Sequence, residues 1–405
     1  MIISILSLIL AGMALLYPYS LPPLLSAACM LLGGALILFL TSLSQTLNLI
    51  PLTNLEQKLV PNLIELYRRD RRLGFGRFWL YLFAFLSFAA AMLLFAADFP
   101  FQQWILPAWI VLFGISLDIL KDSWQSMLRF LNPFYLVNVF ERDAKKAIQN
   151  EKDEVLWSSI DSLSEIALRS VEKSKIALSN QTLQTFPPVI QAFFASSKSI
   201  SRVNLDKETE KATGRDEASY TIFYLLQKLE LINDRALQNR LETVCRQMIM
   251  VMGKIIIASA KFDLSMVSFP THFLSKFGLK AQQHHFAEVA DLTTSTLLEI
   301  ARTILTEIDV TYAELQEPFR AILNGLDALA KGSFKKDKNT SIQVLTQPFK
   351  DIRTLLETEK MDKHTDTPVI LNEIDRIIDE FTALEQVMRA IPAIPEMTGS
   401  DIPPS

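Results

Sequence analysis

Residues 67–97 read YRRDRRLGFGRFWLYLFAFLSFAAAMLLFAA, with four arginines inside five residues directly ahead of a long run that carries no charge. Such a cluster is typical either of a nucleic-acid binding surface or of the edge of a membrane. The chain has 405 residues and 50% of them are hydrophobic, which is high for a purely soluble protein. Nearly all of the excess lies in residues 1–120, so the cluster is interpreted first as a membrane edge.

Four apolar stretches approach the length of a membrane-spanning helix, which is about 20 residues with about 17 as the lower limit. The stretches are residues 2–17, 21–40, 78–97 and 103–120, and the first is long enough only when its flanking residues are counted. The first two stretches are joined by YPYSLPP and the last two by DFPFQQ. Both connections predict tight interfacial turns, so we expect two helical hairpins. A cleaved signal peptide would need a basic residue ahead of the first stretch and a small-residue cleavage site after it, and neither pattern is convincing.

The distribution of basic residues predicts the orientation of these helices. All six Lys and Arg residues of the first 120 lie in the connection 41–77, and the two hairpin turns contain none. Lys and Arg are retained on the cytoplasmic side of a membrane. We therefore expect this basic connection, both termini and residues 121–405 to be cytoplasmic, in a multi-pass protein of the cell (inner) membrane.

Five arginines form the only site that the sequence predicts, with a role in topology or in binding lipid headgroups. They are Arg68, Arg69, Arg71, Arg72 and Arg77. Apolar residues at helical spacing precede them, so this stretch could lie in the interface while the arginines contact anionic headgroups. Pro61 would break one long helix and is expected to begin a second one. The apolar residues are Leu55, Leu59, Val60, Leu63, Ile64 and Tyr67.

Charge argues against two classes of function. The chain has 40 basic and 44 acidic residues, of which 6 and 5 precede residue 121, so residues 121–405 hold 34 against 39. Nucleic-acid binders usually present a basic excess, and we expect no nucleic-acid partner. The middles of the apolar stretches contain no ionisable residue, since Asp98 and Asp118 are expected at their ends, which disfavours a transport path.

Residues 121–390 show helical periodicity almost throughout, and together with the spans they predict an all-α protein. Breaks are expected at residues 186–188, 201–219, 331–341 and 359–367 and at Pro270, delimiting about eight to ten helices. The apolar segment 248–260 is too short for a fifth span and contains Lys254, so a buried helix is expected. Residues 391–405 are interpreted as a disordered tail.

Three similar stretches suggest a repeat in the helical part. Ile166, Ile257 and Ile300 fall in register at steps of 91 and 43 residues, close to two units and one unit of a helix-pair repeat of roughly 40 to 47 residues. The resemblance to HEAT repeats is one of period only. The missing unit would centre near residue 211, inside a polar run, so we expect an irregular bundle or a short solenoid-like stack.

No motif predicts a reaction, a cofactor or a metal, and we expect no enzymatic activity. His272, His284, His285, Glu288 and Asp291 are the one group of ligand-type residues, but zinc sites need three or four ligands at recognisable spacing and no HExxH is present. Ser170 to Lys173 match Ser-x-x-Lys without the partner motifs of that chemistry. The two cysteines, Cys29 and Cys245, indicate no disulfide framework.

The sequence favours a four-span anchor that carries a cytosolic helical domain, as a scaffold or adaptor. The expected partners are membrane lipids, possibly anionic, another protein bound through the helical domain, and possibly a second copy of the chain. The alternative is a component or regulator of an oligomeric channel or transporter. A third interpretation is that the paired apolar segments ahead of a helical part look like the layout of chlamydial inclusion-type proteins, although here apolar residues begin at Ile2 without a polar leader.

Overall fold

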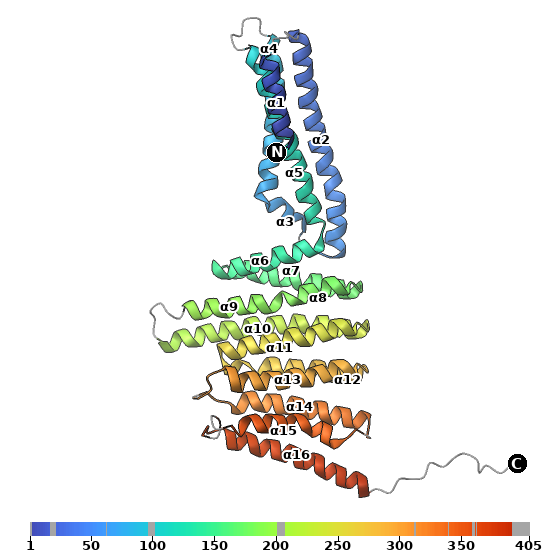
Figure 1. The fold of residues 1–405 in the computed structure, drawn as a ribbon, viewed down its shortest axis with the longest axis vertical. Helices are drawn as coiled ribbons and strands as arrows, with labels where there is room; N and C mark the ends of the chain where they lie inside the picture. Colours follow the sequence, from blue (N-terminus) through green and yellow to red (C-terminus); the bar gives the residue numbers. More distant parts are fainter. Residues whose placement is uncertain are drawn as a thin grey trace, which may run out of the picture. The chain divides into compact units, whose positions relative to one another are not determined.

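The computed structural model describes residues 2–16, 22–61, 63–95, 102–200, 207–311, 313–338, 340–358, 361 and 363–390 (Figure 1). Every regular element in these residues is a helix, and none is a strand. The chain forms two compact units, residues 1–140 and 141–405, which are described separately. The two expected hairpin turns fall largely at residues 17–21 and 96–101, and the expected tail is residues 391–405, all of which lie outside the described residues.

Five helices make up most of the first unit. They are α1 (Ile2–Leu16), α2 (Pro23–Lys58), α3 (Leu63–Arg69), α4 (Arg71–Phe95) and α5 (Gln102–Phe130). The longest pairings are α2 with α4 and α1 with α5, and α5 also contacts α2 and α4. A buried cluster of Ile37, Leu80 and Phe83 lies between α2, α4 and α5, against Trp109 and Phe113. The short helix α3 packs on α2 and α4.

Four helices of the described residues are long and apolar enough to cross a membrane, which indicates a membrane protein. Three of them, Leu24–Lys58, Arg71–Leu94 and Trp104–Phe130, contain the expected spans 21–40, 78–97 and 103–120 apart from a few end residues. The first expected span is the shorter helix α1, of 15 residues. The fourth long apolar helix is α11 (Glu242–Phe262), in the second unit.

The expected basic connection 41–77 is largely helical. Helix α2 continues 18 residues beyond Leu40 and includes Pro51 in its interior. A new helix does follow Pro61, as expected, but it begins at Leu63. Six apolar residues before the arginines were expected to face the membrane interface. Four of them are instead buried in the unit, namely Leu59, Val60, Leu63 and Tyr67. Tyr67 packs edge-on against Phe130 of α5, so these apolar side chains fill the end of the helix bundle.

The second unit is a succession of helices that begins in α6 (Pro133–Gln149), which runs across the boundary between the units. The remaining elements are α7 (Asp153–Glu172), α8 (Ile176–Gln184), α9 (Phe186–Ile200), α10 (Lys207–Gln238), α11, η1 (Leu264–Met266), α12 (Ser268–Gln283), α13 (Ala287–Glu307), α14 (Gln316–Lys336), α15 (Ile342–Leu356) and α16 (Thr367–Ala390).

These helices stack in two layers (Figure 1). Helices α7, α10, α12, α14 and α16 contact one another in that order, and α9, α11, α13 and α15 form a parallel series. Consecutive helices join the layers, as α10 does with α11 and α12 with α13. The α11 and α13 pair approaches closely at Gly253, where an added Cβ would lie 2.5 Å from Cγ2 of Thr296. A two-layer stack of helix pairs is the arrangement of an α-solenoid.

Four tight turns in this unit have no glycine and were missed by the sequence analysis. In each, the second residue after the helix has a positive φ, between 51° and 66°. The next residue donates a backbone hydrogen bond to the carbonyl five positions earlier, over 2.8 to 3.0 Å, which is the Schellman arrangement. The positive-φ residues are Glu151, Ser174, Arg240 and His285. These turns help to explain why the described residues from Pro133 onward contain eleven α-helices instead of eight to ten.

The expected repeat register is only partly seen. Ile257 on α11 and Ile300 on α13 belong to the same layer, but Ile166 lies on α7, which contacts the other layer. The expected break at 201–219 is wrong from Lys207 onward, because α10 begins there. Helix α11 has 72% of its most apolar window buried, against 22 to 39% for the three long apolar helices of the first unit. It is therefore packed as a core helix among α8, α9, α10, α12 and α13.

Candidate site between helices α4 and α5

The five arginines predicted from the sequence do not lie together as one group. Arg68 and Arg69 are exposed on α3, and Arg69 lies 3.6 Å from Glu65 of the same helix. Arg77 turns back on its own helix, because its Nε donates to the carbonyl of Leu73 over 3.2 Å and its guanidinium lies 6.0 Å from the ring centre of Tyr67. Arg72 lines a pocket between α4 and α5.

A capping residue places Arg72 at the first turn of α4. The Oδ1 atom of Asp70 accepts the backbone N–H of Arg72 over 2.8 Å, and the carbonyl of Asp70 accepts the N–H of Gly74 over 3.0 Å. Asp70 is therefore the N-cap of α4, a position that aspartate favours because it satisfies an unpaired helix N–H. The cap fixes where the helix begins and hence the face from which Arg72 projects.

The pocket lies between α4 and the last part of α5, and its volume is about 300 Å³. One lining residue is Gly76, where an added Cβ would lie 3.1 Å from Oγ of Ser123 and 3.3 Å from Cγ2 of Ile119. The two helices are thus almost in contact at Gly76. The pocket residues are Arg72, Leu73, Phe75 and Gly76 of α4, and Ile119, Asp122, Ser123, Gln125, Ser126 and Arg129 of α5.

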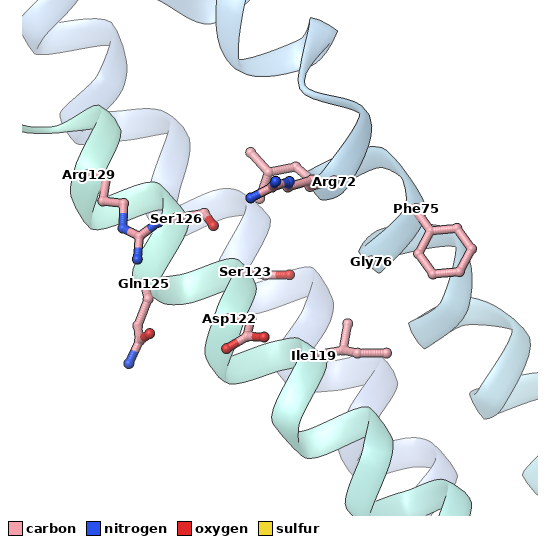
Figure 2. A pocket seen from close by; sticks show the side chains of 10 residues that line it. Arg72, Phe75, Gly76, Ile119, Asp122, Ser123, Gln125, Ser126 and Arg129 are labelled. Atoms are coloured by element: carbon pink, nitrogen blue, oxygen red, sulfur yellow. The ribbon is translucent and has the colours of Figure 1, made fainter. Parts of the chain in front are cut away.

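The polar groups of the pocket come from both helices (Figure 2). Arg72 extends from α4 toward α5, and the hydroxyl of Ser123 points back toward α4, whereas Gln125 points away. Arg72, Asp122 and Arg129 are all exposed, so their charges face solvent or a ligand. In the described part of the chain, no ion pair joins either arginine to a carboxylate. The formal charge of the pocket is +1, from two arginines and one aspartate.

The α5 residues of this pocket were missed because the fourth span was expected to end at residue 120. Helix α5 continues to Phe130, and its positions 119, 122, 123, 126 and 129 share one face at steps of three and four. Met127 and Phe130 are buried on the neighbouring face. This periodicity past the first charged residues was the sequence signal that the helix, and a polar face along it, extends beyond the apolar run.

A second polar group lies inside the first unit at Asp118, which was expected at the end of a span. It is instead 12 residues from the end of α5 and is 7% exposed. Its Oδ2 accepts the backbone N–H of Ser4 over 3.0 Å and also the hydroxyl of Ser4. The carboxylate of Asp118, on α5, thus binds the first turn of α1 and holds the two helices together.

Two residues of the histidine group take part in structural contacts. His285 is the positive-φ residue of the turn between α12 and α13, and Glu288 pairs with Arg246 over 2.7 Å. In the described residues, no group of three or more His, Cys, Asp or Glu side chains could hold a metal. Burial raises the pKa of Cys245 to about 12, so its thiol stays protonated at neutral pH.

In this pocket, exposed charges of both signs and hydroxyl groups line a cavity, and its net charge is positive. Its arginines and hydroxyls are groups that donate hydrogen bonds to oxyanions. Comparisons with protein families, with curated proteins and with solved structures found no match to the chain.

Proposed function

We propose that the protein is a multi-pass membrane protein whose first unit anchors the second, a stack of helices, at the cytoplasmic face, where the stack binds another protein or a second copy of the chain. The observation that carries the anchor is the apolar outer face of α4. Phe78, Phe85 and Met92 follow at steps of seven and are 63%, 70% and 77% exposed. A continuous apolar face of this kind is costly in water and is matched by lipid chains.

The length of the apolar helices supports the same proposal. The uncharged part of α4 from Phe78 to Phe95 spans about 27 Å at the helical rise, close to the hydrocarbon thickness of about 30 Å. Helix α2 adds an exposed apolar face with Leu24, Leu32 and Phe39. The concentration of basic residues from Lys58, at the end of α2, to Arg77 in α4 supports a cytoplasmic position for the connection 41–77, and therefore for the second unit.

The stacked helices support a binding role for the second unit. Solenoid-like stacks present long side-chain surfaces, and several of their members can contact one partner at once. The unit has a hydrophobic core of its own, which includes Ile255, Leu297, Phe319, Phe349 and Phe381. The core does not depend on the surface side chains, so these can bind a partner. Membrane attachment would restrict this binding to the membrane surface.

A replacement of the anchor tests this function. Residues 1–120 are exchanged for an unrelated four-span module with both termini in the cytoplasm, and proteins crosslinked to the parent chain in native membranes are identified by mass spectrometry. We expect the exchanged chain to retain the same partner in a pulldown from membranes. Loss of the partner, with the second unit still folded and membrane-bound, would contradict an anchor role.

The channel or transporter alternative predicts a different result. Ion or solute flux would appear in proteoliposomes that contain the parent chain and disappear after the exchange. The one buried acidic group of the described spans, Asp118, is engaged by Ser4 at the start of α1. Its use in packing favours the anchor over a path for ions, which would require ionisable groups facing an aqueous cavity.

A further inference from the structure

We propose that the pocket between α4 and α5 binds the phosphodiester headgroup of a singly charged anionic lipid, with Arg72 and Arg129 on the phosphate. The proposal rests on the membrane-anchor function, because it requires α4 and α5 to sit in a bilayer. It replaces a diffuse role for five arginines by a discrete site. Two of its residues, Ser126 and Arg129, lie on a helix that the arginine cluster does not include.

The two arginines suit a phosphate that enters from the lipid side. Each guanidinium carries five N–H donors in a planar fork, which matches the oxygens of a phosphate. They reach the pocket from different helices, so one phosphate can be held from both sides (Figure 2). Neither pairs with a carboxylate in the described part of the chain, unlike Arg69 with Glu65.

The pocket lies at the outer edge of the headgroup layer. The apolar part of α4 begins at Phe78, six residues after Arg72, which corresponds to about 9 Å along the helix. On α5 the last apolar residue before the charges is Leu120, and Ser126 lies about 9 Å further on. The headgroup and interfacial region extends about 5 to 8 Å beyond each side of the hydrocarbon core. Arg72 and Ser126 therefore lie at the outer edge of the headgroup layer, and Arg129 lies three residues further along α5. The long arginine side chains must extend toward the membrane to contact a lipid phosphate.

The pocket also contains the groups expected for the rest of such a lipid. Ser123 and Ser126 provide hydroxyls that can donate to phosphate oxygens or contact the ester region, and Ile119, Leu73 and Phe75 provide apolar surface beside them. Asp122 can accept a hydrogen bond from a hydroxyl of the headgroup. The formal charge of +1 in the pocket is neutralised by one monoanionic headgroup. Phosphatidylglycerol has a headgroup with one negative charge and with free hydroxyls.

The test uses the full-length protein purified in detergent, titrated with phosphatidylglycerol and followed by native mass spectrometry. The double variant Arg72→Gln/Arg129→Gln removes two exposed charges from the pocket. The matched control Arg68→Gln/Arg69→Gln removes two exposed charges from the same cluster outside the pocket. We expect the first to weaken binding at least about tenfold and the second to weaken it less than about threefold, since charge-assisted hydrogen bonds are lost only in the first.

A third variant separates shape from charge. Ser126→Leu keeps both arginines but fills part of the pocket, and we expect it to weaken phosphatidylglycerol binding as much as the first double variant. Phosphatidylcholine, which has the same phosphodiester but no net charge, should bind at least about tenfold more weakly to the parent chain. Inorganic phosphate at the same concentration as the lipid should not compete, because it lacks the apolar part that occupies the pocket.

Several results would overturn the site. Equal weakening by the two double variants would mean diffuse attraction, equal binding of phosphatidylcholine would mean that charge is not recognised, and competition by inorganic phosphate would mean a site for a free anion. All variants are first tested for retention in membranes after alkaline carbonate extraction. Loss of retention in the parent chain refutes the membrane anchor itself, whereas retention without a pocket-specific effect refutes only the lipid site.

Discussion

Asp118 of α5 caps the N-terminus of α1, because its carboxylate accepts the backbone N–H of Ser4 at 3.0 Å and the hydroxyl of the same residue. The first N–H groups of a helix have no partner within that helix, and a nearby carboxylate satisfies them and interacts favourably with the helix dipole. Here the cap comes from 114 residues away in the sequence. A local capping residue could have held α1 in any position, but this one fixes α1 against α5.

Replacing Asp118 should therefore loosen the first unit. Asp118→Ala leaves a partly buried N–H without its partner, and we expect a loss of about 1 to 3 kcal/mol in the free energy of unfolding in detergent micelles. The matched control is Asp122→Ala, one turn further along α5 at an exposed position. Denaturant-induced unfolding followed by tryptophan fluorescence measures both. Equal stability of the two variants would show that the capping contact contributes nothing.

Close approach of α2 to α4 predicts an asymmetry between two glycines. A Cβ added at Gly34 would lie 2.7 Å from Cβ of Ser87, whose hydroxyl accepts Trp109 Nε1–H over 2.8 Å, whereas nothing lies within 4 Å of a Cβ at Gly74. We expect Gly34→Ala to destabilise the bundle by about 1 to 3 kcal/mol, because overpacking forces the helices apart. Gly74→Ala should be neutral or stabilising by up to about 1 kcal/mol, from helix propensity.

Thermal unfolding of both glycine variants in the same detergent provides the comparison. The difference in near-ultraviolet circular dichroism between each variant and the same variant with Trp109→Phe reports on whether the contact of Trp109 with Ser87 survives. A Gly34 variant that is as stable as the parent chain and keeps this signal would contradict the close packing of the two helices. A strongly destabilised Gly74 variant would indicate that α4 begins differently.

Hydrophobic periodicity was sufficient to predict the helical class and the positions of the long apolar helices, since lipid-facing and core-facing runs differ from polar segments over many residues. It could not predict the ends of α2 and α5, because a helix can extend past its apolar part when the polar residues have good helix propensity. The pocket followed from such an extension, with Ser126 and Arg129 one to three turns beyond the expected end of the span.

The turns of the second unit were missed for a different reason. Glycine is the usual residue at a positive-φ helix end, whereas the expected breaks were placed at prolines and at polar runs. Glu151 and Arg240 take that conformation here, at a local cost that the packing of the adjoining helices offsets. No pattern in the residues themselves marks such a turn. The contact of Asp118 with Ser4 was equally hidden, because nothing in the sequence indicates which helix lies beside α1.

The proposed orientation predicts the outcome of reporter fusions. A reporter that is active only outside the cytoplasm should work when fused near position 99 and fail when fused after Arg77 or after Ser405, because the connection rich in arginine is retained inside. Replacing Arg68, Arg69, Arg71, Arg72 and Arg77 together should scramble this pattern. Activity of the reporter at Ser405 in the unmodified chain would contradict the cytoplasmic position of the second unit.

The second unit should fold without the first. Residues 142–390, which lie within the second compact unit, contain a core of their own, and their most apolar helix α11 is buried by its neighbours. We expect this fragment to be monodisperse without detergent and to give the circular dichroism spectrum of a helical protein. A requirement for detergent, or a spectrum dominated by strand, would mean that its helices need the membrane unit to pack.

An ion-pair group between α10 and α12 predicts how the stability of that fragment depends on pH. Glu230 of α10 lies 2.6 Å from Nζ of Lys276 and 3.1 Å from Nζ of Lys280, both of α12. The hydrogen bond from Lys276 lowers the pKa of Glu230 from its ordinary value of 4.5, and the second lysine acts in the same direction. The unfolded chain therefore takes up a proton on Glu230 at a higher pH than the folded chain does.

This difference stabilises the folded state fully above about pH 4.5 and is lost as the pH falls below that value toward the lower pKa of the folded state. The melting temperature of fragment 142–390, measured by circular dichroism between about pH 3 and pH 6, should fall on acidification, and Glu230→Gln should reduce this fall. Glu299→Gln provides the control, since Glu299 is exposed on α13 and makes no ion pair in the described residues. Because Glu230 is partly exposed, added salt should shrink the difference between the parent fragment and Glu230→Gln. A Glu230→Gln fragment with the same pH profile as the parent would show that the contact between α10 and α12 does not depend on this carboxylate.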